Sequence, residues 1–592
     1  MSSKFSVVCA FVAASSSLVL LDSAPAWATT PAAPNLDADA AKPASAGAEA
    51  LRLALAMPGA ASEEARTHYG SSAYRGLWFG PDGDDLAALA LLTELEGAAA
   101  HGLAPSRYRV GALRAAIVAG RTGAPAAVAA AEVALTAAFL KYARDVSSGV
   151  LEPRTVDREL HIWPERPDEL VLLSALRRAP KTDDFLRGLA PAHPEYGRLI
   201  EELRTLSAAA PDLWGDPVSA GRTMRLGETG PRIAEMRARL IAMGDMRDGG
   251  PATGGLAPAN QAGSGAPVAD IVAADPTVDP NAETVFAPQD DVFDEELEAA
   301  VRVFQLRHGL NDDGVAGPKT VKAMNATVEE RIGQIIVNLE RLRWLNIDLG
   351  RRHIYVNQAD FTVRLVEDGQ ILFQERVVIG KTRKHRTPEF SDQMTHLVFN
   401  PTWHVPRSIA TEEILPKLRE DPNYLATQNM RLVANGGEAP DPAFTDWSLY
   451  SASDFPYRIK QRPGGANALG RVKFMFPNQF SIYLHDTPSK RLFAKDARAF
   501  SHGCVRVQDP MALARALLGP QSDEPASYVE RILDREKERT VNLAEPVPVH
   551  LTYRTAWVDE YGQRQFRDDI YGRDARILAA LRAAGVGAAV GG

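Results

Sequence analysis

At 592 residues, the chain is too long to fold around one hydrophobic core, so several domains are expected. Its apolar content of 45% and charged content of 24% are ordinary for globular protein. The formal net charge of −9 argues against a general nucleic-acid-binding protein, because such a protein needs a basic surface.

The N-terminus has the pattern of an export signal. Lys4 is followed by an apolar run over residues 5–21 and then by Ala26-Trp27-Ala28, with small residues at the cleavage positions. We therefore predict a signal peptide over residues 1–28. A membrane anchor is the alternative, but the run is short and serines interrupt it. No later stretch is expected to be long and apolar enough to span a bilayer, so the mature protein is expected to be exported and soluble.

The first third of the mature chain is predicted to be helical. Residues 29–60 are rich in Ala and Pro and predict a flexible leader. Residues 61–220 predict a helical scaffold domain. Within it, helices are expected over about 86–96 and, beginning at Pro125, over about 126–142.

A second helical unit is predicted over residues 221–326, with an insertion inside it. Helices are expected over about 231–243 and 296–308, and a short third helix ends at Met324. Between the first two, residues 249–289 are rich in Gly, Ala, Pro and Asp, which predicts a disordered insertion.

The periodicity changes from helical to alternating after a linking helix predicted over residues 327–350. The alternation predicts a mostly β domain over 351–556, with strands at about 353–356, 361–366, 374–379, 396–399, 472–476, 481–484 and 547–553. Residues 411–462 interrupt it with one helix, about 412–419, and no predicted strand, which is typical of a functional loop or capping subdomain. Residues 557–592 form a C-terminal segment.

Cys504 is the only cysteine expected to remain after signal cleavage, because the other is Cys9. An oxidising compartment favours paired cysteines, so a single thiol there suggests a chemical role. If residues 501–507 form one strand, His502, Cys504 and Arg506 share a face, because successive side chains alternate. Tyr483 and His485 likewise share a face of a strand that we expect nearby.

These residue types suit nucleophilic catalysis. Cys504 supplies the thiolate, and the His485 imidazole lowers its pKa or takes its proton. The backbone N–H groups of Gly503 and Cys504 are expected to bind the oxyanion. Arg506 offers a cation for a substrate carboxylate. His502 could orient the loop, bind substrate or assist the base.

Two other interpretations of the same residues remain open. Cys504 could be a small buried hydrophobe, although its polar neighbours would then have no explanation. His485, His502 and Cys504 could instead be three zinc ligands with an open position, although Arg506 would place a positive charge beside the metal. The nucleophile is the favoured interpretation, and neither a metal nor a cofactor is expected.

The catalytic segment also resembles a known family. Ser501-His502-Gly503-Cys504-Val505-Arg506-Val507, preceded by Tyr483-Leu484-His485-Asp486-Thr487-Pro488, resembles the signature of the L,D-transpeptidases with a YkuD-type domain. Further matches lie at 387–390, 400–403, 467–474 and 568–574. The unit over 221–326 resembles a three-helix peptidoglycan-binding domain, and the whole arrangement resembles the large, YcbB-like periplasmic branch.

The resemblance implies a multidomain α+β protein. It would combine the helical scaffold and peptidoglycan-binding domains with a mostly β catalytic domain, a YkuD-like β-sandwich carrying the capping subdomain. It also implies Cys504 as the acyl-enzyme nucleophile and His485 as general base and acid. The expected substrate-binding residues are Arg506, His502, Tyr483, Ser501, Asn467 and Trp403.

The implied reaction takes place in the periplasm on peptidoglycan tetrapeptide stems, as donor and as acceptor. Cys504 would form a thioester with release of D-alanine, and an amine of a neighbouring stem would resolve it into a 3→3 cross-link. Carbapenems would acylate the same thiol. The same thioester could instead be resolved by water or a free D-amino acid, making a carboxypeptidase, an exchange enzyme or a cross-link hydrolase. A wall-binding scaffold with a silent catalytic domain is a further alternative, and other cell-wall enzymes are possible partners.

Overall fold

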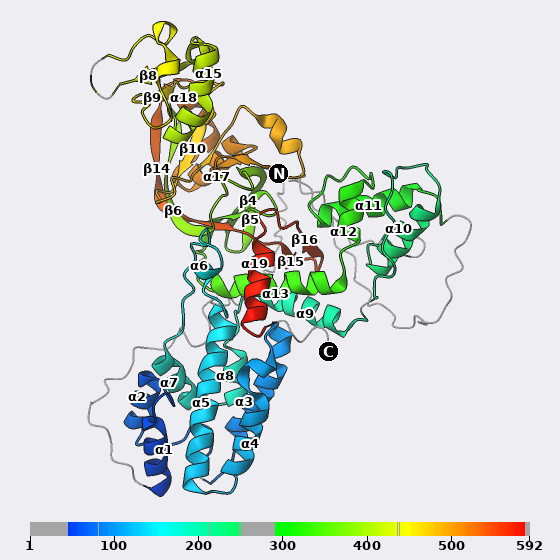
Figure 1. Cartoon of the computed structure of the whole chain (residues 1–592), viewed down its shortest axis with the longest axis vertical. Coiled ribbons are helices and arrows are strands. Elements are labelled where there is room, and N and C mark those ends of the chain that lie inside the picture. The colour runs from blue at the N-terminus through cyan, green and yellow to red at the C-terminus, as the bar shows by residue number, and fades with distance from the viewer. Residues whose placement is uncertain are drawn as a thin grey trace, which may run out of the picture.

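The computed structural model describes residues 45–247, 250–251 and 290–586, apart from residues 81, 211, 435 and 437. The predicted signal peptide lies outside the described residues, as does most of the predicted insertion. Figure 1 shows a helical foot, a central β domain, a helical lobe beside it and a small lobe above it. The predicted multidomain α+β fold is confirmed: helical lobes accompany a mostly β domain.

The foot is built from helices around one long central helix, α5 (Pro125–Ser148). α5 extends six residues beyond the predicted 126–142, because Ala143 and Val146 continue its buried face until Gly149, whose φ is +92°. The other helices of the foot are α1 (Ala46–Ala56), α2 (Glu63–Ser71), α3 (Leu86–Glu96), α4 (Val110–Gly120), α7 (Glu169–Arg178) and α8 (Thr182–Arg187). Two more helices, α6 (Pro153–Val156) and α9 (Pro194–Ala208), lie in the middle of the molecule.

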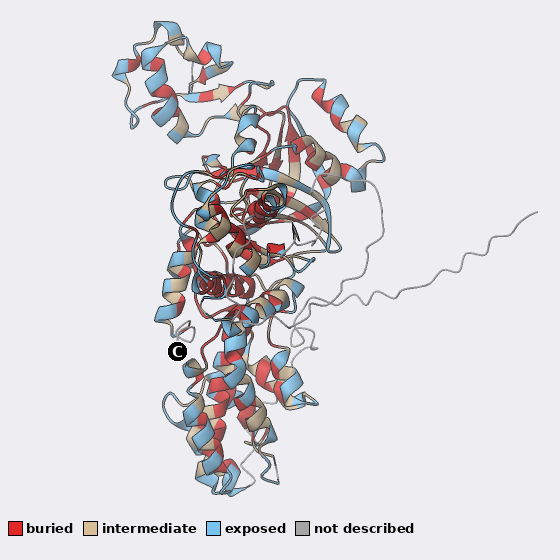
Figure 2. Cartoon of the chain, turned by 90° about the vertical axis from the view of Figure 1, so that its right-hand side faces the viewer, coloured by how far each residue is buried: buried red, intermediate tan, exposed pale blue. Residues whose placement is uncertain are grey.

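The expectation that no later stretch is long and apolar enough to span a membrane is wrong, because α5 meets both criteria. It is 24 residues long, and its most apolar window has a mean hydropathy of 1.4. Half of that window is buried within the protein, where α5 packs against α1 and α4. A core helix of a helical domain has the same composition, and Figure 2 shows buried residues along this part of the foot.

The lobe beside the β domain contains α10 (Pro231–Ala242), α11 (Glu295–Arg307) and α12 (Pro318–Met324). Two isolated bridges, Met224 with Ala316 and Thr229 with Val292, join the segments on either side of the predicted insertion. Of that insertion, Gly250–Pro251 form β2, which pairs with β1 (Met246–Arg247). Phe304 on α11 is fully buried, so it is a core residue of this lobe.

The linking helix α13 (Val328–Trp344) is buried along most of its length. It begins with a capping box between Thr327 and Glu330. α13 packs against α9 and against α19 (Arg573–Ala583) of the C-terminal segment. Because α13 also contacts α5, it links the foot to the C-terminal segment.

The β domain is one nine-stranded sheet in the order β12-β5-β13-β11-β10-β6-β14-β3-β4, and β4 also pairs with β5. The sheet therefore closes on itself around a core that includes Leu397, Phe474 and Val505. Its strands are β3 (Arg352–Asn357), β4 (Thr362–Glu367), β5 (Gln370–Gly380), β6 (Phe390–Phe399), β10 (Val472–Met475), β11 (Leu484–His485), β12 (Ala499–Ser501), β13 (Val505–Val507) and β14 (Arg539–Thr552). α17 (Pro510–Leu518) and α18 (Pro525–Leu533) contribute to the same core.

Two predicted strands are broken in the structure. Residues 501–507 are not one strand: β12 ends at Ser501 and β13 begins at Val505, because Gly503 between them has a φ of +112°. The strand predicted over 481–484 is reduced to Leu484–His485, since Ser481 has a φ of +56°. Both breaks lie beside Cys504.

The capping subdomain contains strands that the sequence did not predict. β7 (Trp403–His404), β9 (Arg458–Gln461) and β8 (Met430–Val433) form a three-stranded sheet. The helix predicted over 412–419 is a composite of α14 (Arg407–Ile409), a π-helical turn (Ala410–Ile414) and α15 (Leu415–Glu420), and α16 (Tyr424–Thr427) follows. A separate core, including Leu418, Trp447 and Phe455, holds this lobe together.

The C-terminal segment returns to the centre of the molecule. A hairpin of β15 (Ala556–Val558) and β16 (Arg564–Phe566) follows β14 and packs on α9 and α13. α19 then lies against α13 and α6. This return brings residues near 573 to the boundary between the foot and the β domain.

Candidate active site

Cys504 lies in the break between β12 and β13, where its side chain is partly exposed and free. Ser501 braces this break, because its Oγ donates to the Cys504 carbonyl at 2.5 Å and accepts from the Gly503 N–H at 3.1 Å. Any side chain at position 503 would be strained, since its Cβ would lie 3.0 Å from Ile482 Cδ1 at a positive φ. The glycine therefore shapes the turn that presents the thiol.

The Gly503 N–H was predicted to bind the oxyanion, but the structure gives it another partner. It is already bonded to Ser501 Oγ, so it is not free to bind substrate as the loop stands. Across the described ranges, the Cys504 N–H has no hydrogen-bond partner. The geometry therefore leaves the Cys504 amide as the free donor of the predicted pair.

Tyr483 lies directly across from Cys504 on the neighbouring segment. The Val505 N–H donates to the Tyr483 carbonyl at 3.1 Å, and the Cys504 Sγ lies 3.6 Å from the Ser481 carbonyl oxygen. Burial raises the pKa of the Cys504 thiol to about 11, against the opposing effects of Tyr483, Arg506 and Lys473. Cys504 is therefore a neutral thiol at pH 7.

His485 is buried on β11, where it pairs with Arg506 of β13. Its Nδ1 lies 2.5 Å from the Asp486 carbonyl oxygen, which assigns the proton to Nδ1 and leaves Nε2 as an acceptor. Burial, together with Arg506, Lys473 and Lys490, lowers its pKa to about 3. His485 is therefore a neutral imidazole at pH 7.

The Asp486 carboxylate is not the partner of His485. It accepts from the Arg471 N–H at 2.8 Å, from the Thr487 N–H at 2.7 Å and from Lys490 Nζ at 2.8 Å. A backbone carbonyl, not a carboxylate, thus orients the imidazole. A hydrogen bond from Cys504 to His485 is absent from the part of the chain that the structure describes.

Arg506 occupies the same face as Cys504 and carries an unsatisfied guanidinium. In the described part of the chain it makes no ion pair, and its buried Nε has no hydrogen-bond partner. A partly buried cation without a partner favours an incoming carboxylate. Its place on β13, two residues after the thiol, fits the predicted role in substrate binding.

His502 does not share the face of Cys504 and Arg506, because the chain turns at Gly503. Its Nε2 lies 2.6 Å from Glu413 Oε1 in the π-helical turn of the capping subdomain. Lys381 Nζ is 3.5 Å from the same nitrogen, and the His385 ring is 4.5 Å away between centroids. His502 thus joins the catalytic loop to the capping subdomain.

The remaining predicted binding residues differ in their access to substrate. Asn467 is 1% exposed, and its amide nitrogen donates to the carbonyls of Pro401 and Arg462 at 3.0 and 2.9 Å. The structure therefore gives it a structural role in its loop, not an exposed contact. Trp403 is partly exposed on β7, where it pairs with Gln461.

Lys473 is a neighbour of the site that the sequence reasoning missed. It lies on β10, pairs with His485, and places its Nζ 5.8 Å from the Tyr483 ring centroid. Burial lowers its pKa. The signal was present, since a lysine alternates with buried Val472 and Phe474 and so faces away from the core.

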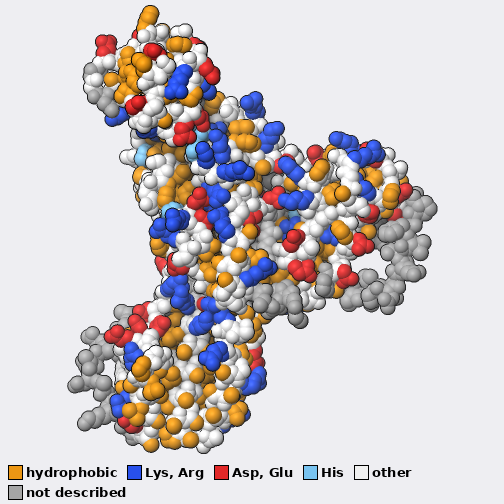
Figure 3. Space-filling model, in the orientation of Figure 1, with side chains coloured by type: hydrophobic (Ala, Val, Ile, Leu, Met, Phe, Trp, Pro, Cys, Tyr) orange, Lys and Arg blue, Asp and Glu red, His pale blue; other side chains and the backbone are white. Residues whose placement is uncertain are grey.

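Charge and possible metal ligands around the site complete its description. On the face shown in Figure 3, Lys and Arg side chains gather over the middle of the molecule, whereas hydrophobic side chains dominate the foot. Among the residues that the structure describes, no group of three or more His, Cys, Asp or Glu side chains is arranged to hold a metal ion.

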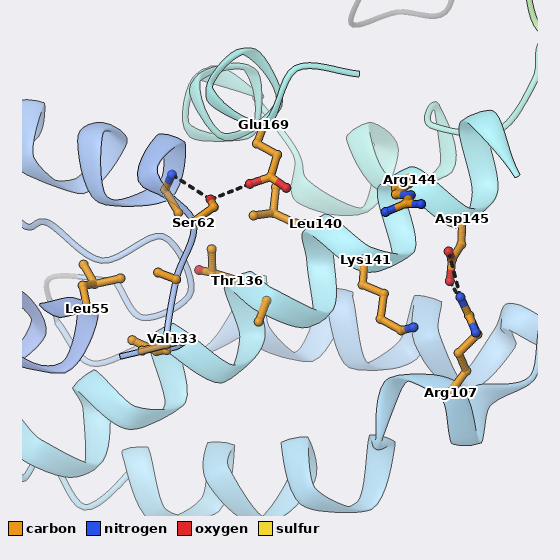
Figure 4. Close-up of a pocket in the computed structure, with 15 residues that line it drawn as sticks. Leu55, Ser62, Arg107, Val133, Thr136, Leu140, Lys141, Arg144, Asp145 and Glu169 are labelled. Atoms are coloured by element: carbon orange, nitrogen blue, oxygen red, sulfur yellow. Dashed lines mark hydrogen bonds and ion pairs between the residues drawn. The ribbon is translucent and has the colours of Figure 1, made fainter. Parts of the chain in front are cut away.

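A cavity of about 440 Å³ lies elsewhere, in the foot beside α5. Figure 4 shows the Ser62–Glu169 hydrogen bond at one end and the Arg107–Asp145 ion pair at the other. None of the residues lining it belongs to the catalytic segment. We therefore assign this cavity no part in the chemistry of Cys504.

Three stretches of the chain match family models. Residues 351–545 match the YkuD family, an L,D-transpeptidase catalytic domain. Residues 63–203 match a scaffold domain, and residues 283–324 match a "Putative peptidoglycan binding domain".

Relatives with known names agree with these matches. A "Putative L,D-transpeptidase" of Haemophilus influenzae is 36% identical over 244 residues, which cover 41% of this chain and 48% of that protein. The chain thus matches about half the length of this curated relative.

Among solved structures, an L,D-transpeptidase from Mycobacterium smegmatis is 14% identical, with 34% of this chain and 58% of that one covered and a TM-score of 0.17. An L,D-transpeptidase from Xylanimonas cellulosilytica is 13% identical, with 57% and 100% covered and a TM-score of 0.15. The family matches and the curated relative carry the conclusion: this chain contains a YkuD-type L,D-transpeptidase catalytic domain together with a peptidoglycan-binding domain.

Proposed function

We propose that the protein is a peptidoglycan L,D-transpeptidase with Cys504 as its nucleophile and His485 as its general base and acid. The observation that carries the proposal is the arrangement of the residues: His485 on β11 pairs with Arg506 on β13, two residues after Cys504, and the Nε of Arg506 has no partner among the described residues. A thiol and an imidazole that are both neutral suit proton transfer during attack, whereas a preformed ion pair does not require it.

In the acylation step, the Cys504 sulfur attacks the carbonyl of the L,D-peptide bond after the diamino-acid residue of a tetrapeptide stem. The thiol proton passes to His485 Nε2, and the imidazolium returns it to the departing amine of D-alanine. The thioester that forms replaces the broken C–N bond. The Cys504 N–H would bind the oxyanion, and one such donor contributes on the order of 3 kcal/mol to barrier lowering.

In the second step, a side-chain amine of a neighbouring stem attacks the thioester. The amine gives its proton to the imidazole, the C–S bond breaks, and the thiol is restored as a 3→3 cross-link forms. Arg506 binds a carboxylate of the donor stem, because its cation otherwise lies partly buried without a partner. The peptidoglycan-binding domain would hold the polymer near the site.

Resolution of the same thioester by water is the second candidate. The specific observation that favours it is that Cys504 is only partly buried. The protein would then be an L,D-carboxypeptidase or a cross-link hydrolase. A free D-amino acid as acceptor would instead give exchange, by the same acyl-enzyme.

Product analysis on sacculi rich in tetrapeptide stems tests these proposals. The wild type should release D-alanine and form 3→3 dimers, and Cys504→Ala should do neither while remaining folded. Tripeptide products without dimers would establish the carboxypeptidase. An active alanine variant would eliminate Cys504 as the nucleophile, and intact-protein mass spectrometry after incubation with a carbapenem would detect the acyl-enzyme directly.

We further propose that the chain acts in the periplasm after removal of residues 1–28, and that it belongs to the large YcbB-like branch. The support is the order of a scaffold domain, a peptidoglycan-binding domain and a catalytic domain along the chain. Signal-peptide cleavage is tested by N-terminal sequencing of the protein recovered from the periplasmic fraction, which should begin at Thr29.

A further inference from the structure

The carbonyl of Gly503 is held by a side chain outside the catalytic segment. Thr387 Oγ1 donates to this oxygen at 2.7 Å and accepts from the Gly380 N–H at 3.0 Å. The hydroxyl is completely buried, so both of its hydrogen bonds are shielded from water. Because Gly503 immediately precedes Cys504, Thr387 constrains the peptide unit that carries the nucleophile.

The backbone of Thr387 is fixed on both sides. Its N–H donates to the Tyr571 hydroxyl at 3.3 Å, and this hydroxyl donates to the Gly380 carbonyl at 2.7 Å. Its carbonyl accepts from Arg573 Nη2 at 3.0 Å. Tyr571 and Arg573 both belong to the C-terminal segment, so that segment holds Thr387 in place.

Arg573 also connects Thr387 to the scaffold segment that follows α6. It is fully buried and pairs with Glu389 at 2.9 Å and with Glu159 at 3.2 Å. The segment after α6 adds backbone bonds, since the Glu389 N–H donates to the Glu159 carbonyl at 3.0 Å and the His161 N–H donates to the Glu389 carbonyl at 2.8 Å. The scaffold therefore supports the segment before β6 that carries Thr387.

We propose that Thr387 is a positioning residue for Cys504, and that Arg573 and Glu159 hold it in place, so that the scaffold and C-terminal segment set the geometry of the nucleophile. This proposal rests on the proposed function for its activity readout. A hydroxyl that fixes the Gly503 carbonyl keeps the free Cys504 N–H and the sulfur at a constant relative position. Misplacing a reacting group slows a reaction without weakening substrate binding.

The test compares Thr387→Val with Thr387→Ser in the full chain. Valine removes the hydroxyl at nearly constant volume, whereas serine retains it. The rate constant for acylation of Cys504 by a carbapenem should fall about tenfold in Thr387→Val, because a buried acceptor loses its donor, with little change in the apparent dissociation constant. Thr387→Ser should restore the rate to within about twofold of the wild type.

A matched control separates positioning from stability. Thr552, at the end of β14, is similarly buried, and its Oγ1 donates to the Val356 carbonyl at 3.0 Å. Thr552→Val should lower the melting temperature as Thr387→Val does, yet leave the acylation rate constant unchanged. Equal acylation rate constants in the two valine variants would overturn the proposal.

A thiol-exchange measurement keeps the test independent of the proposed reaction. The rate at which Cys504 reacts with a small aromatic disulfide should rise severalfold in Thr387→Val, because a released loop exposes the sulfur, and should stay unchanged in Thr552→Val. If the wild type forms no acyl-enzyme at all, the proposed function fails. Positioning is then decided by thiol exchange alone, and an unchanged rate in Thr387→Val would overturn it.

The contribution of the scaffold is tested by a double-mutant cycle. Glu159→Gln removes one charge from Arg573 and should slow acylation about threefold, a modest effect because Glu159 is partly exposed. In the Thr387→Val background the same change should have no further effect, since the coupling passes through Thr387. Additive losses would show that Glu159 acts independently of the nucleophile loop.

Discussion

The raised pKa of Cys504 predicts how fast its thiol reacts with a disulfide reagent. This rate distinguishes an enzyme whose resting cysteine is a neutral thiol from one whose resting cysteine is a thiolate. A thiol with a pKa of about 11 contains about a hundredfold less thiolate at pH 7.5 than one with the ordinary pKa of 9.0. The higher pKa makes each thiolate about six to ten times more nucleophilic, so the net reaction with a disulfide reagent should be slowed about tenfold.

The assay is the second-order rate constant for reaction of the folded protein with an aromatic disulfide between pH 6 and 9.5. We expect the logarithm of this rate constant to rise with a slope of one throughout, because thiolate accumulates up to pH 11. Cys504→Ala provides the blank, and a short unfolded peptide carrying the same Ser-His-Gly-Cys segment provides the unperturbed thiol.

A plateau below pH 8 would contradict this account. It would mean that Cys504 and His485 form a thiolate–imidazolium pair, as in cysteine proteases with depressed thiol pKa values. In that case His485→Ala should abolish the plateau. If the thiol is neutral, His485→Ala should leave the slope at one, since the imidazole does not stabilise a resting thiolate.

Three further predictions concern the surrounding residues. His485→Gln should slow acylation by about 10²- to 10⁴-fold, as measured by stopped-flow fluorescence. Because the pKa of His485 is lowered in the folded protein, the unfolded chain binds more protons than the folded one between about pH 3 and 6.5. The stability of the wild type should therefore fall as the pH decreases across that window. The stability of His485→Gln should fall less steeply. His550→Gln is the control, because its pKa is also lowered, to about 4, and it should change acid stability while leaving acylation intact. Asn467→Ala should cost about 1–3 kcal/mol in urea unfolding, because the two carbonyls it serves lose their donor, while the folded fraction keeps its activity; a stable but inactive variant would restore its predicted role in binding. Glu413→Gln should weaken the contact to His502 and increase hydrogen exchange in residues 410–420, and unchanged exchange would show that the contact does not hold the capping subdomain.

Local patterns were sufficient to predict much of the secondary structure. Hydrophobic periodicity indicated helices such as α3 and α10 and strands such as β3 and β10. This was possible because the apolar residues of a buried face recur with the period of the helix or strand. The same reasoning missed β8 and β9, since apolar and polar residues alternate only weakly in them. Their strand conformation comes from pairing with each other, which local spacing does not encode.

The amino-acid sequence was also sufficient to single out Cys504 and His485, because a lone thiol, a nearby histidine and the motif around them are local features. It did not show that Gly503 breaks the strand, which directs His502 to the capping subdomain and engages the Gly503 N–H with Ser501. Nor could it show the contacts of Arg573 with Glu159 and Glu389, which lie 414 and 184 residues away along the chain. Residue types and spacing were therefore enough to propose the reacting groups. Only the tertiary structure decided how the surrounding buried charges and carbonyls are arranged, because these contacts form once the scaffold, the closed sheet and the C-terminal helix pack together.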